Sequence, residues 1–485
     1  MQYEPVIGLE IHAQLLTQTK IFCGCSTRFG LPPNVNVCPV CLGFPGALPV
    51  LNRRVVDLAV RAALGLGCTV QTTSIFARKN YFYPDLPKGY QISQYELPLA
   101  TSGDVELVVD GVSRNVGITR VHLEEDAGKS LHEGFSDSER KSYVDFNRTG
   151  VPLIEIVTEP ELRSSSEAAM FFESLREILL ALEVNDGNME EGSLRCDANV
   201  SVRPAGQTTL GTKTEIKNLN SFRYLQKAID YEIQRQVTLL DEGGVVKQET
   251  RLWDTVVGRT ASMRSKEEAH DYRYFPEPDL PPLRLKRSWI DQQRQELPEL
   301  PEQRCQRLMT QYGLSSYDAS ILGRGRWGGG DYFEKLVASG AEPKVAANWM
   351  LGDVKRKMNE LGHQDLESFV QRIPPVQLTE LLKLVEAGSI SGSIAKEVFE
   401  KMYSTKGLAS DIVRDEGLSQ IDDRAELISV VREVLKNHPG PVAQYRGGKK
   451  STLGFLVGQV MKTTGGKANP KLVNELLRVA LEEKT

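Results

Sequence analysis

Long apolar runs are missing from this sequence of 485 residues. No run reaches the ~18 apolar residues that a membrane-spanning helix needs, which excludes a protein that crosses a membrane by helices. The first residues, MQYEPVIG, hold neither a basic stretch nor an apolar core. We therefore expect no secretion signal and a cytoplasmic location. The net charge of −5 is mild for this length, so composition alone does not indicate a nucleic-acid partner.

The phosphate-binding sequence GxxxxGK followed by Ser or Thr is also missing. Any nucleotide site must therefore be built in a less common way. Signatures of a serine nucleophile or of a cysteine–histidine nucleophile are absent as well. These absences leave open an enzyme that works through metal ions and charged groups.

Cysteine is scarce, with seven in the chain, but four of them form a cluster of CxC and CxxC pairs: Cys23, Cys25, Cys38 and Cys41. Four thiols from two turns suit tetrahedral zinc, and they leave no open position for water, so we expect a structural rather than a catalytic zinc site. Free buried thiols are the alternative. The isolated Cys68, Cys196 and Cys305 are expected to be small apolar core residues.

Five segments alternate apolar and polar side chains with a period of two, which predicts half-buried antiparallel strands. The segments are Val6–Leu15, Arg120–Asp126, Tyr143–Asn147, Pro152–Glu159 and Leu194–Arg203. Their polar faces carry Glu, Asp, His, Asn and Arg rather than the Thr, Lys, Ser and Gln of an ordinary exposed sheet. Carboxylates of this kind are the ligands of a magnesium-bound phosphate site. The pattern indicates an enzyme.

The acidic candidates for this site are Glu10, Glu124, Glu125, Asp126, Glu155, Glu190, Glu191 and Asp197. His12 shares a strand face with Glu10, so it could bind a metal or move a proton. Because Glu124 and Glu125 lie at the end of a strand, either one could point into the site. Cations that could neutralise a triphosphate or an acyl phosphate are interleaved with these acids. They are Lys79, Lys88, Lys129, Arg148, Arg195, Lys213 and Lys217.

The chain is predicted to be an α+β protein of three domains. Residues 1–292 should form a domain based on an antiparallel sheet, with helices from about Ser164 to Leu182 and from Ser221 to Leu240. A helical domain should follow over 293–405, and a small helical tail over 406–485. From Val442 to Arg478 the tail holds an excess of Lys and Arg over acids. This excess predicts contact with nucleic-acid phosphates.

The sequence resembles the family of B subunits of the glutamyl/aspartyl-tRNA amidotransferases over nearly its whole length. The segments that carry the resemblance are GLEIHAQL (8–15), RKNYFYPDLPKGYQISQY (78–95), HLEEDAGK (122–129), VDFNRTGVPLIEIVTEP (144–160), MEEGSLRCDANVSVR (189–203), KNLNSF (217–222), DYRYFPEPD (271–279) and the tail segment 454–477. The resemblance implies a cradle domain, a helical domain and a tail domain that binds tRNA.

The resemblance also implies a ligase activity. A partner amidase subunit would release ammonia from glutamine, and a small third subunit would wrap around both partners to give a heterotrimer. In this chain, ATP would phosphorylate the side-chain carboxylate of Glu or Asp on misacylated tRNA(Gln) or tRNA(Asn). Ammonia would then displace the phosphate, because phosphate leaves far more readily than oxide.

The family's magnesium positions fall here on His12, Glu125 and Glu155, with Glu10 beside them. The polar mouth of the ammonia channel falls on Lys79, Lys88 and Glu125. Contacts to ATP are expected from Arg195, Asp197, Lys213 and Lys217.

Two other interpretations remain. A non-catalytic tRNA-binding scaffold is disfavoured because acidic faces would repel tRNA phosphates. The archaeal-type relative has a large inserted domain before its tail, and this chain has only about 100 helical residues there.

Overall fold

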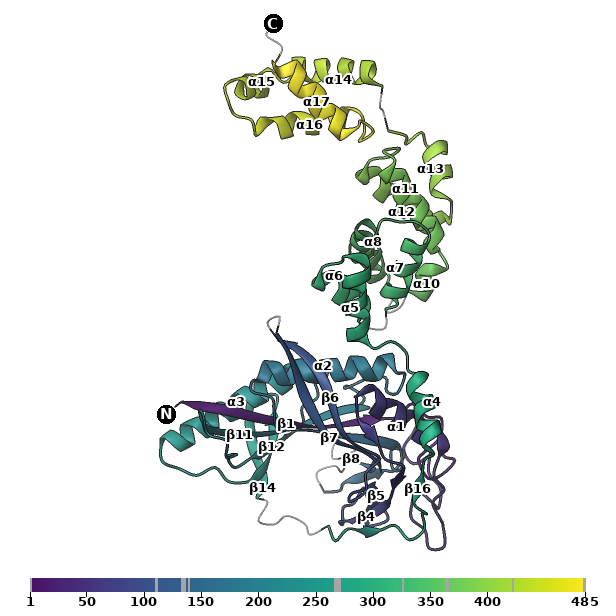
Figure 1. Ribbon diagram of the computed structural model, residues 1–485, viewed down its shortest axis with the longest axis vertical. Coiled ribbons are helices and arrows are strands. Elements are labelled where there is room, and N and C mark those ends of the chain that lie inside the picture. The colour runs from purple at the N-terminus through teal and green to yellow at the C-terminus, as the bar shows by residue number, and fades with distance from the viewer. Residues whose placement is uncertain are drawn as a thin grey trace. The chain divides into compact units, whose positions relative to one another are not determined.

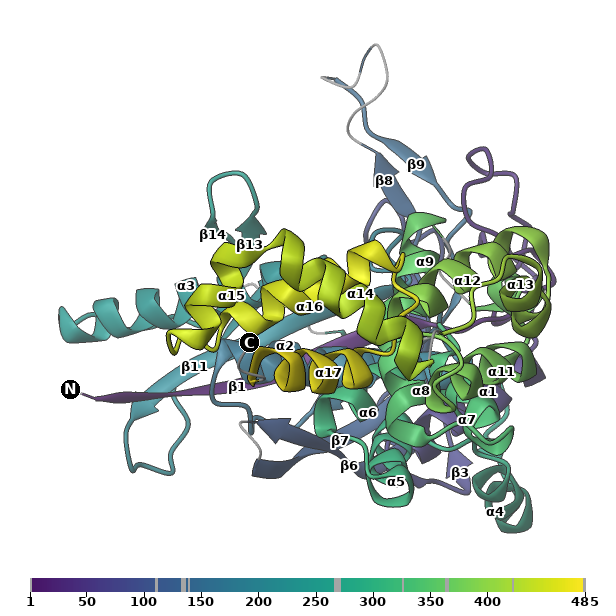
Figure 2. The ribbon, with the colours of Figure 1, turned by 90° about the horizontal axis from the view of Figure 1, so that it is seen from above.

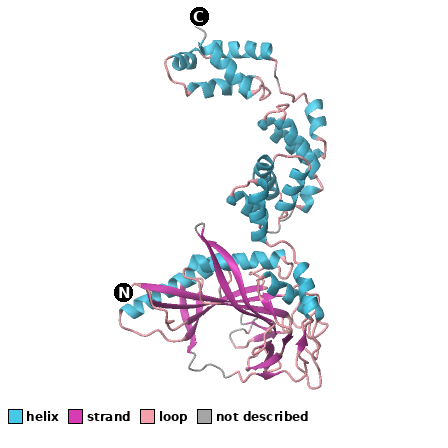
Figure 3. Ribbon diagram, in the orientation of Figure 1, coloured by secondary structure: helices cyan, strands magenta, loops and turns pink. Residues whose placement is uncertain are grey.

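The structure is a computed structural model that describes residues 2–109, 112–131, 137, 140–265, 272–324, 327–362, 366–420 and 423–482. The chain divides into two compact units, Met1–Leu300 and Pro301–Thr485. The strands lie in the first unit, and the second is built of helices (Figure 3). The predicted α+β class is confirmed. None of the described helices is long and apolar enough to cross a membrane.

A nine-stranded sheet forms the centre of the first unit (Figure 1). In spatial order its strands are β14 (Arg259–Ser265), β13 (Glu249–Asp254), β12 (Thr214–Lys217), β11 (Leu194–Pro204), β1 (Tyr3–Gln14), β10 (Pro152–Thr158), β7 (Val112–Glu125), β6 (Ala100–Val109) and β2 (Thr69–Val70). The β12–β13 pair is parallel, whereas the other described pairs of this sheet are antiparallel. Antiparallel pairing predominates, as the sequence predicts.

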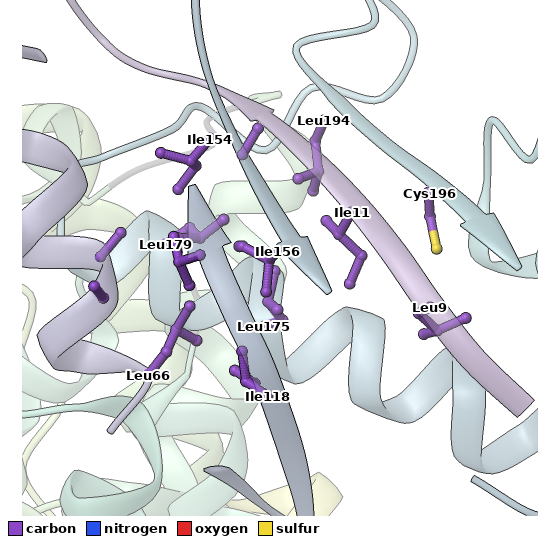
Figure 4. Close-up of a cluster of buried hydrophobic side chains, with 14 of the residues drawn as sticks. Leu9, Ile11, Leu66, Ile118, Ile154, Ile156, Leu175, Leu179, Leu194 and Cys196 are labelled. Carbon is purple, nitrogen blue, oxygen red and sulfur yellow. The ribbon is translucent and has the colours of Figure 1, made fainter. Parts of the chain in front are cut away.

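One face of this sheet is apolar and is covered by helices. Leu9 and Ile11 of β1, Ile156 of β10 and Leu175 and Leu179 of helix α2 belong to one cluster of buried apolar side chains (Figure 4). The helices of this unit are α1 (Arg53–Gly65), α2 (Ser165–Ala181), α3 (Phe222–Asp241) and α4 (Arg287–Gln295). Because successive side chains of a strand point to opposite faces, the polar residues between these apolar ones lie on the face away from α2.

Both predicted helix starts follow from hydroxyl caps. The side chain of Ser164 accepts a hydrogen bond from the Glu167 amide at the start of α2, and Ser221 accepts one from the Tyr224 amide at the start of α3. Helix α3 ends just before Gly243, whose φ of 80° suits a residue without a Cβ. Such caps contribute about 1 kcal/mol each.

Three small sheets flank the large one. They contain β15 (Phe275–Pro276), β4 (Phe76–Asn80) and β5 (Tyr90–Gln94); β16 (Leu283–Arg284) and β3 (Thr73–Ser74); and β8 (Lys129–Leu131) and β9 (Tyr143–Asp145). The predicted strand at Tyr143–Asn147 therefore exists in part, but it pairs with β8 and not with the large sheet. Asp271 of the DYRYFPEPD segment lies outside the described residues.

The second unit contains two separate apolar cores. The first is formed by α5 (Pro301–Tyr312), α6 (Ser316–Gly323), α7 (Gly329–Ala338), α8 (Pro343–Trp349), a π-helical segment (Met350–Val354), α9 (Lys355–Glu360), α10 (Glu367–Val370), α11 (Pro375–Glu386), α12 (Gly392–Thr405) and α13 (Ala409–Asp415). The second belongs to the tail helices, which lie side by side (Figure 2): α14 (Arg424–Asn437), α15 (Pro439–Arg446), α16 (Thr452–Thr463) and α17 (Pro470–Glu482).

The predicted domain limits near 292 and 405 stay predictions. Residue 292 falls inside α4, whose Ile290 packs in the core of the first unit. Residues Ala409 and Val413 of α13 pack in the core that precedes the tail.

Candidate active site

The register of four adjacent strands brings polar side chains together on the face away from α2. His12 of β1 lies opposite Glu155 of β10 on one side and opposite Arg195 of β11 on the other. Glu155 in turn lies opposite His122 of β7. Directly opposite residues point to the same face of a sheet. The polar residues of these alternating segments therefore form one continuous polar surface.

Three side chains on this surface could hold a metal ion. Donor atoms of His12, Glu124 and Glu155 lie within 4.8 Å of one another. His12 Nε2 is 3.3 Å from a Glu155 oxygen and 3.6 Å from a Glu124 oxygen. Both carboxylates are buried. Two carboxylates beside an imidazole nitrogen fit a divalent cation such as Mg²⁺, which also keeps water and phosphate oxygens in its shell.

The charges of this cluster support one another. Burial lowers the pKa of His12, but the hydrogen bond and charge of Glu155 and the charge of Glu124 raise it to about 8. Burial alone would raise the pKa of Glu155; the charges of His122, His12 and Lys79 instead hold it well below its usual range. Glu155 is therefore ionised at neutral pH.

His122 is a member of this cluster that the sequence did not single out. It is 3% exposed, and its Nε2 lies 3.5 Å from a Glu155 oxygen and 3.8 Å from a Glu124 oxygen. Its position two residues before Glu124 on a predicted strand was the available signal. An alternating strand places the two on one face.

Glu125, expected beside His12 and Glu155, lies elsewhere, and its neighbour Glu124 takes that place. The Glu125 carboxylate pairs with Lys88 and accepts a hydrogen bond of 2.8 Å from the Ile92 amide. Both side chains of this pair line a second cavity beside Cys23 and Cys41. The two expected residues Lys88 and Glu125 are thus brought together, but away from the His12 cluster, because adjacent residues of β7 face opposite ways.

A cavity of about 460 Å³ opens over the polar face, and we call it the polar pocket. Its charged lining residues are His12, Lys79, Glu124, Asp126, Arg148, Arg195, Asp197 and Lys217. Both positive and negative groups line it, which suits an anion bound together with a cation.

Lys79 enters this pocket under aromatic cover. Its ammonium lies 4.9 Å from the centre of the Tyr272 ring and 6.0 Å from that of Tyr81. Burial opposes its charge, but Glu124 and Glu155 raise the pKa of Lys79 above its ordinary value. The lysine is therefore charged in the pocket.

Asp126 positions two of the cations. Its carboxylate lies 3.1 Å from Arg195 and 3.6 Å from Arg148. Burial would raise the pKa of Asp126, but these two guanidinium groups lower it. The Nε atom of Arg195 is buried and has no hydrogen-bond partner among the described residues. A donor left free beside the pocket fits a bound phosphate oxygen.

The remaining expected residues differ in their placement. Lys217 lies 2.9 Å from an Asp197 oxygen, and both line the pocket. Glu10 accepts a hydrogen bond of 2.8 Å from Asn199 and is not part of the three-residue donor group. Lys213 is exposed just before β12 and does not line the pocket.

The four clustered cysteines meet as their spacing predicts. The sulfur atoms of Cys23, Cys25, Cys38 and Cys41 lie within 4.8 Å of one another. The Cys38 amide donates to the Cys41 sulfur at 3.2 Å. A hydrogen bond with Cys23 and the nearby Lys20 charge lower the pKa of Cys41. This arrangement fits a tetrahedral metal ion.

Comparison with known proteins agrees with the motifs. A family model described as the GatB/GatE catalytic domain matches residues 5–291, and one described as the GatB domain matches residues 331–481. The B subunit of the aspartyl/glutamyl-tRNA(Asn/Gln) amidotransferase of Moorella thermoacetica is 56% identical over 481 residues, 99% of this chain and 100% of the relative. That of Thermodesulfovibrio yellowstonii is 55% identical over 483 residues, 100% of both chains. This chain therefore belongs to the family of aspartyl/glutamyl-tRNA(Asn/Gln) amidotransferase B subunits.

Proposed function

We propose that this chain is the subunit of a tRNA-dependent amidotransferase that activates and amidates the side-chain carboxylate of a misacylated tRNA. The substrates would be Glu-tRNA(Gln) and Asp-tRNA(Asn), and the products Gln-tRNA(Gln) and Asn-tRNA(Asn). The activity is that of an ATP-dependent carbon–nitrogen ligase with glutamine as the source of nitrogen. Aminoacyl-tRNAs are used in the cytoplasm, and we place the reaction there.

One observation carries this proposal: the polar pocket combines a three-residue metal-type cluster with cations. His12, Glu124 and Glu155 would hold Mg²⁺. ATP bound with this ion would supply the phosphoryl group that turns a carboxylate into an acyl phosphate. A carboxylate needs this activation because oxide is a very poor leaving group.

The cations of the pocket would hold the phosphates and the growing negative charge. Arg195 and Arg148 are oriented by Asp126, and Lys217 is oriented by Asp197. Lys79 brings a further charge close to the two carboxylates. Groups fixed in advance in this way stabilise a transferred phosphoryl group without reorganisation during the reaction.

The partners follow from family membership. We propose an amidase subunit that delivers ammonia, and a small third subunit that completes a heterotrimer. The tail would bind tRNA, because its helices expose several cations. Lys449 and Lys450 precede α16, and Lys471 lies in the first turn of α17. Ammonium and backbone groups at helix starts are well suited to phosphate.

For the four cysteines we propose a structural Zn²⁺ ion. Four thiolates fill all four tetrahedral positions, so the ion would have no place for substrate or water. It would instead fix the loop that connects the two cysteine pairs.

The test uses the complex reconstituted with its amidase and small subunits. It is given Glu-tRNA(Gln), ammonia and labelled ATP, and wild type is compared with Glu155→Gln. A matched control is Glu242→Gln, which alters an exposed carboxylate after α3. We expect tRNA-dependent ATP cleavage and Gln-tRNA formation in wild type and control, and loss of both in Glu155→Gln at unchanged tRNA affinity. Full activity of Glu155→Gln would place the chemistry outside this pocket and favour the scaffold interpretation.

A further inference from the structure

Lys20 is a fully buried lysine of the first unit, with 0% of its surface exposed. Its ammonium has three polar neighbours: the carbonyl oxygen of Asn36 at 2.7 Å, that of Phe146 at 3.3 Å and the sulfur of Cys41 at 3.6 Å. An ammonium has three N–H donors, so each neighbour can accept one. All three N–H donors of Lys20 therefore have an acceptor.

Among the described residues, no Asp or Glu oxygen lies within ion-pair distance of the Lys20 ammonium; Glu125, which lines the same cavity, pairs with Lys88. Two of the three polar neighbours of the ammonium are neutral carbonyls. A buried charge is costly unless an opposite charge compensates it. Cys41 is the neighbour that can carry one, as a thiolate. A zinc ion with four thiolates has a net charge of −2, so the zinc site needs a compensating positive charge nearby.

The same ammonium joins the cysteine loop to the polar pocket. Residues between the two cysteine pairs are hydrogen-bonded to the segment after β9. The Asn36 amide donates to the Asn147 side chain at 2.8 Å, and the Phe146 amide donates to the Asn34 side chain at 2.8 Å. Arg148, which follows Asn147 in the chain, lines the polar pocket and donates to the Ala127 carbonyl at 2.9 Å.

Gly150 brings the two regions into direct contact. Its φ is +81°, and a Cβ placed on it would lie 3.6 Å from the Cys41 Cβ and 3.5 Å from the Lys20 Cδ. Its carbonyl accepts from the Ile21 amide at 2.9 Å, and its amide donates to the Asp126 carbonyl at 2.9 Å. Asp126 orients two cations of the pocket, so this short path leads from the thiols to the pocket.

We propose that Lys20 is the positioning residue that neutralises part of the charge of the four-thiolate zinc site and ties that site to the segment Phe146–Arg148, whose Arg148 lines the polar pocket. This inference rests on the proposed zinc site and is independent of the proposed amidation. It predicts that the zinc ion stabilises the segment Phe146–Arg148 through Lys20, although the ion takes no part in the reaction.

The test measures zinc affinity of the full chain by competition with a coloured chelator, together with the thiolate-to-metal absorption of the Co²⁺ form. Four proteins are compared: wild type, Lys20→Met, Cys41→His and the double variant. Cys41→His keeps four ligands but removes one negative charge, since histidine binds metal as a neutral group. Lys227→Met, at an exposed position of α3, is the matched control.

We expect Lys20→Met to weaken zinc binding roughly 10- to 100-fold while the tetrahedral cobalt spectrum persists, as for other residues that contact metal ligands. In the Cys41→His background the same change should leave affinity close to that of Cys41→His alone, because less charge needs compensation. Equal losses in both backgrounds, or no loss in either, would overturn the proposal.

If Lys20→Met does not fold, the double variant should fold and bind zinc; its failure would assign Lys20 a purely structural role. A wild type that binds no zinc would overturn both the zinc site and this inference.

A second measurement tests the link to the pocket. Hydrogen–deuterium exchange of amides 145–151 is followed in wild type before and after a chelator removes the metal. Exchange should rise in this segment and stay unchanged in α14, which lies in the other unit. In Lys20→Met the metal should protect the segment less. Identical exchange with and without metal would disprove the link.

Discussion

Glu124 and Glu125 are adjacent in β7, and their carboxylates lie on opposite faces of the nine-stranded sheet. A Glu124 oxygen is 3.6 Å from His12 Nε2, whereas Glu125 pairs with Lys88 and lines a different cavity. Two residues of the same type therefore have different surroundings, and their variants should fail in different ways.

Glu124→Gln should remove a metal ligand without unfolding the chain. We expect tRNA-dependent ATP cleavage by the reconstituted complex to fall at least about 100-fold, because the metal contributes several kcal/mol to charge stabilisation and about 1.36 kcal/mol corresponds to tenfold. Magnesium titration of the ATP cleavage rate should show a raised requirement for the ion. If Glu124→Gln retains the wild-type rate and magnesium requirement, Glu124 is not a ligand.

Glu125→Gln should instead act on stability. The side chains of Lys88 and Glu125 are 7% and 2% exposed, so removal of one leaves the other buried and unpaired. We expect a loss of about 3–5 kcal/mol in the free energy of unfolding for Glu125→Gln or Lys88→Met. In the double variant with Lys88→Met the loss should be clearly smaller than the sum, which denaturant titration can measure. Additive losses would show that the pair is not coupled.

An acid-sensitive ion pair links α5 to α7 in the second unit. Glu334 lies 3.0 Å from Arg304 and 2.5 Å from Arg307. The hydrogen bond from Arg307 outweighs burial and lowers the pKa of Glu334. A lowered folded-state pKa means that the pair stabilises fully above the unfolded-state pKa of about 4.3 and loses its effect as pH falls through the folded-state value.

Glu334→Gln should therefore lower stability at pH 7 and have less effect in acid. The measurement is the free energy of unfolding of wild type and variant from neutral pH to below pH 4. Glu433→Gln, at an exposed position of α14, is the control and should show little difference at any pH. A wild-type advantage that persists unchanged into acid would contradict the assignment.

Sequence periodicity predicted the polar face well because strand side chains alternate strictly. The pattern of Glu10, His12 and Gln14 placed the face of β1 correctly, and the same holds for Arg195 and Asp197 on β11. At the end of β7 the pattern had too few residues left to decide between Glu124 and Glu125. A shift of one residue exchanges the two faces, so the choice between Glu124 and Glu125 decides on which side of the sheet the carboxylate lies.

Contacts between distant segments could not be predicted in this way. The role of Lys20 depends on Asn36 and Cys41, which lie in the same long segment between β1 and α1 as Lys20, and on Phe146, which follows β9. Loop geometry leaves no period in the sequence, and a lone lysine is normally exposed. The strand at Tyr143–Asp145 was predicted from its alternation. Alternation does not identify the partner of a strand, so the pairing with β8 could not be predicted.

The tail offers a test of tRNA binding that is separate from catalysis. Lys449 and Lys450 are exposed in the turn between α15 and α16, where Gly448 has a φ of +100°. Changing both lysines to alanine should weaken tRNA binding and reduce the slope of log affinity against log salt by about 1 for each phosphate that is no longer neutralised. Filter binding across a salt series measures both quantities. The control Lys227→Ala lies on α3 of the first unit and should leave the slope unchanged. Unaltered affinity and slope in the double variant would place the tRNA-binding surface elsewhere in the chain, because phosphate neutralisation by exposed cations cannot be removed without a change in salt dependence.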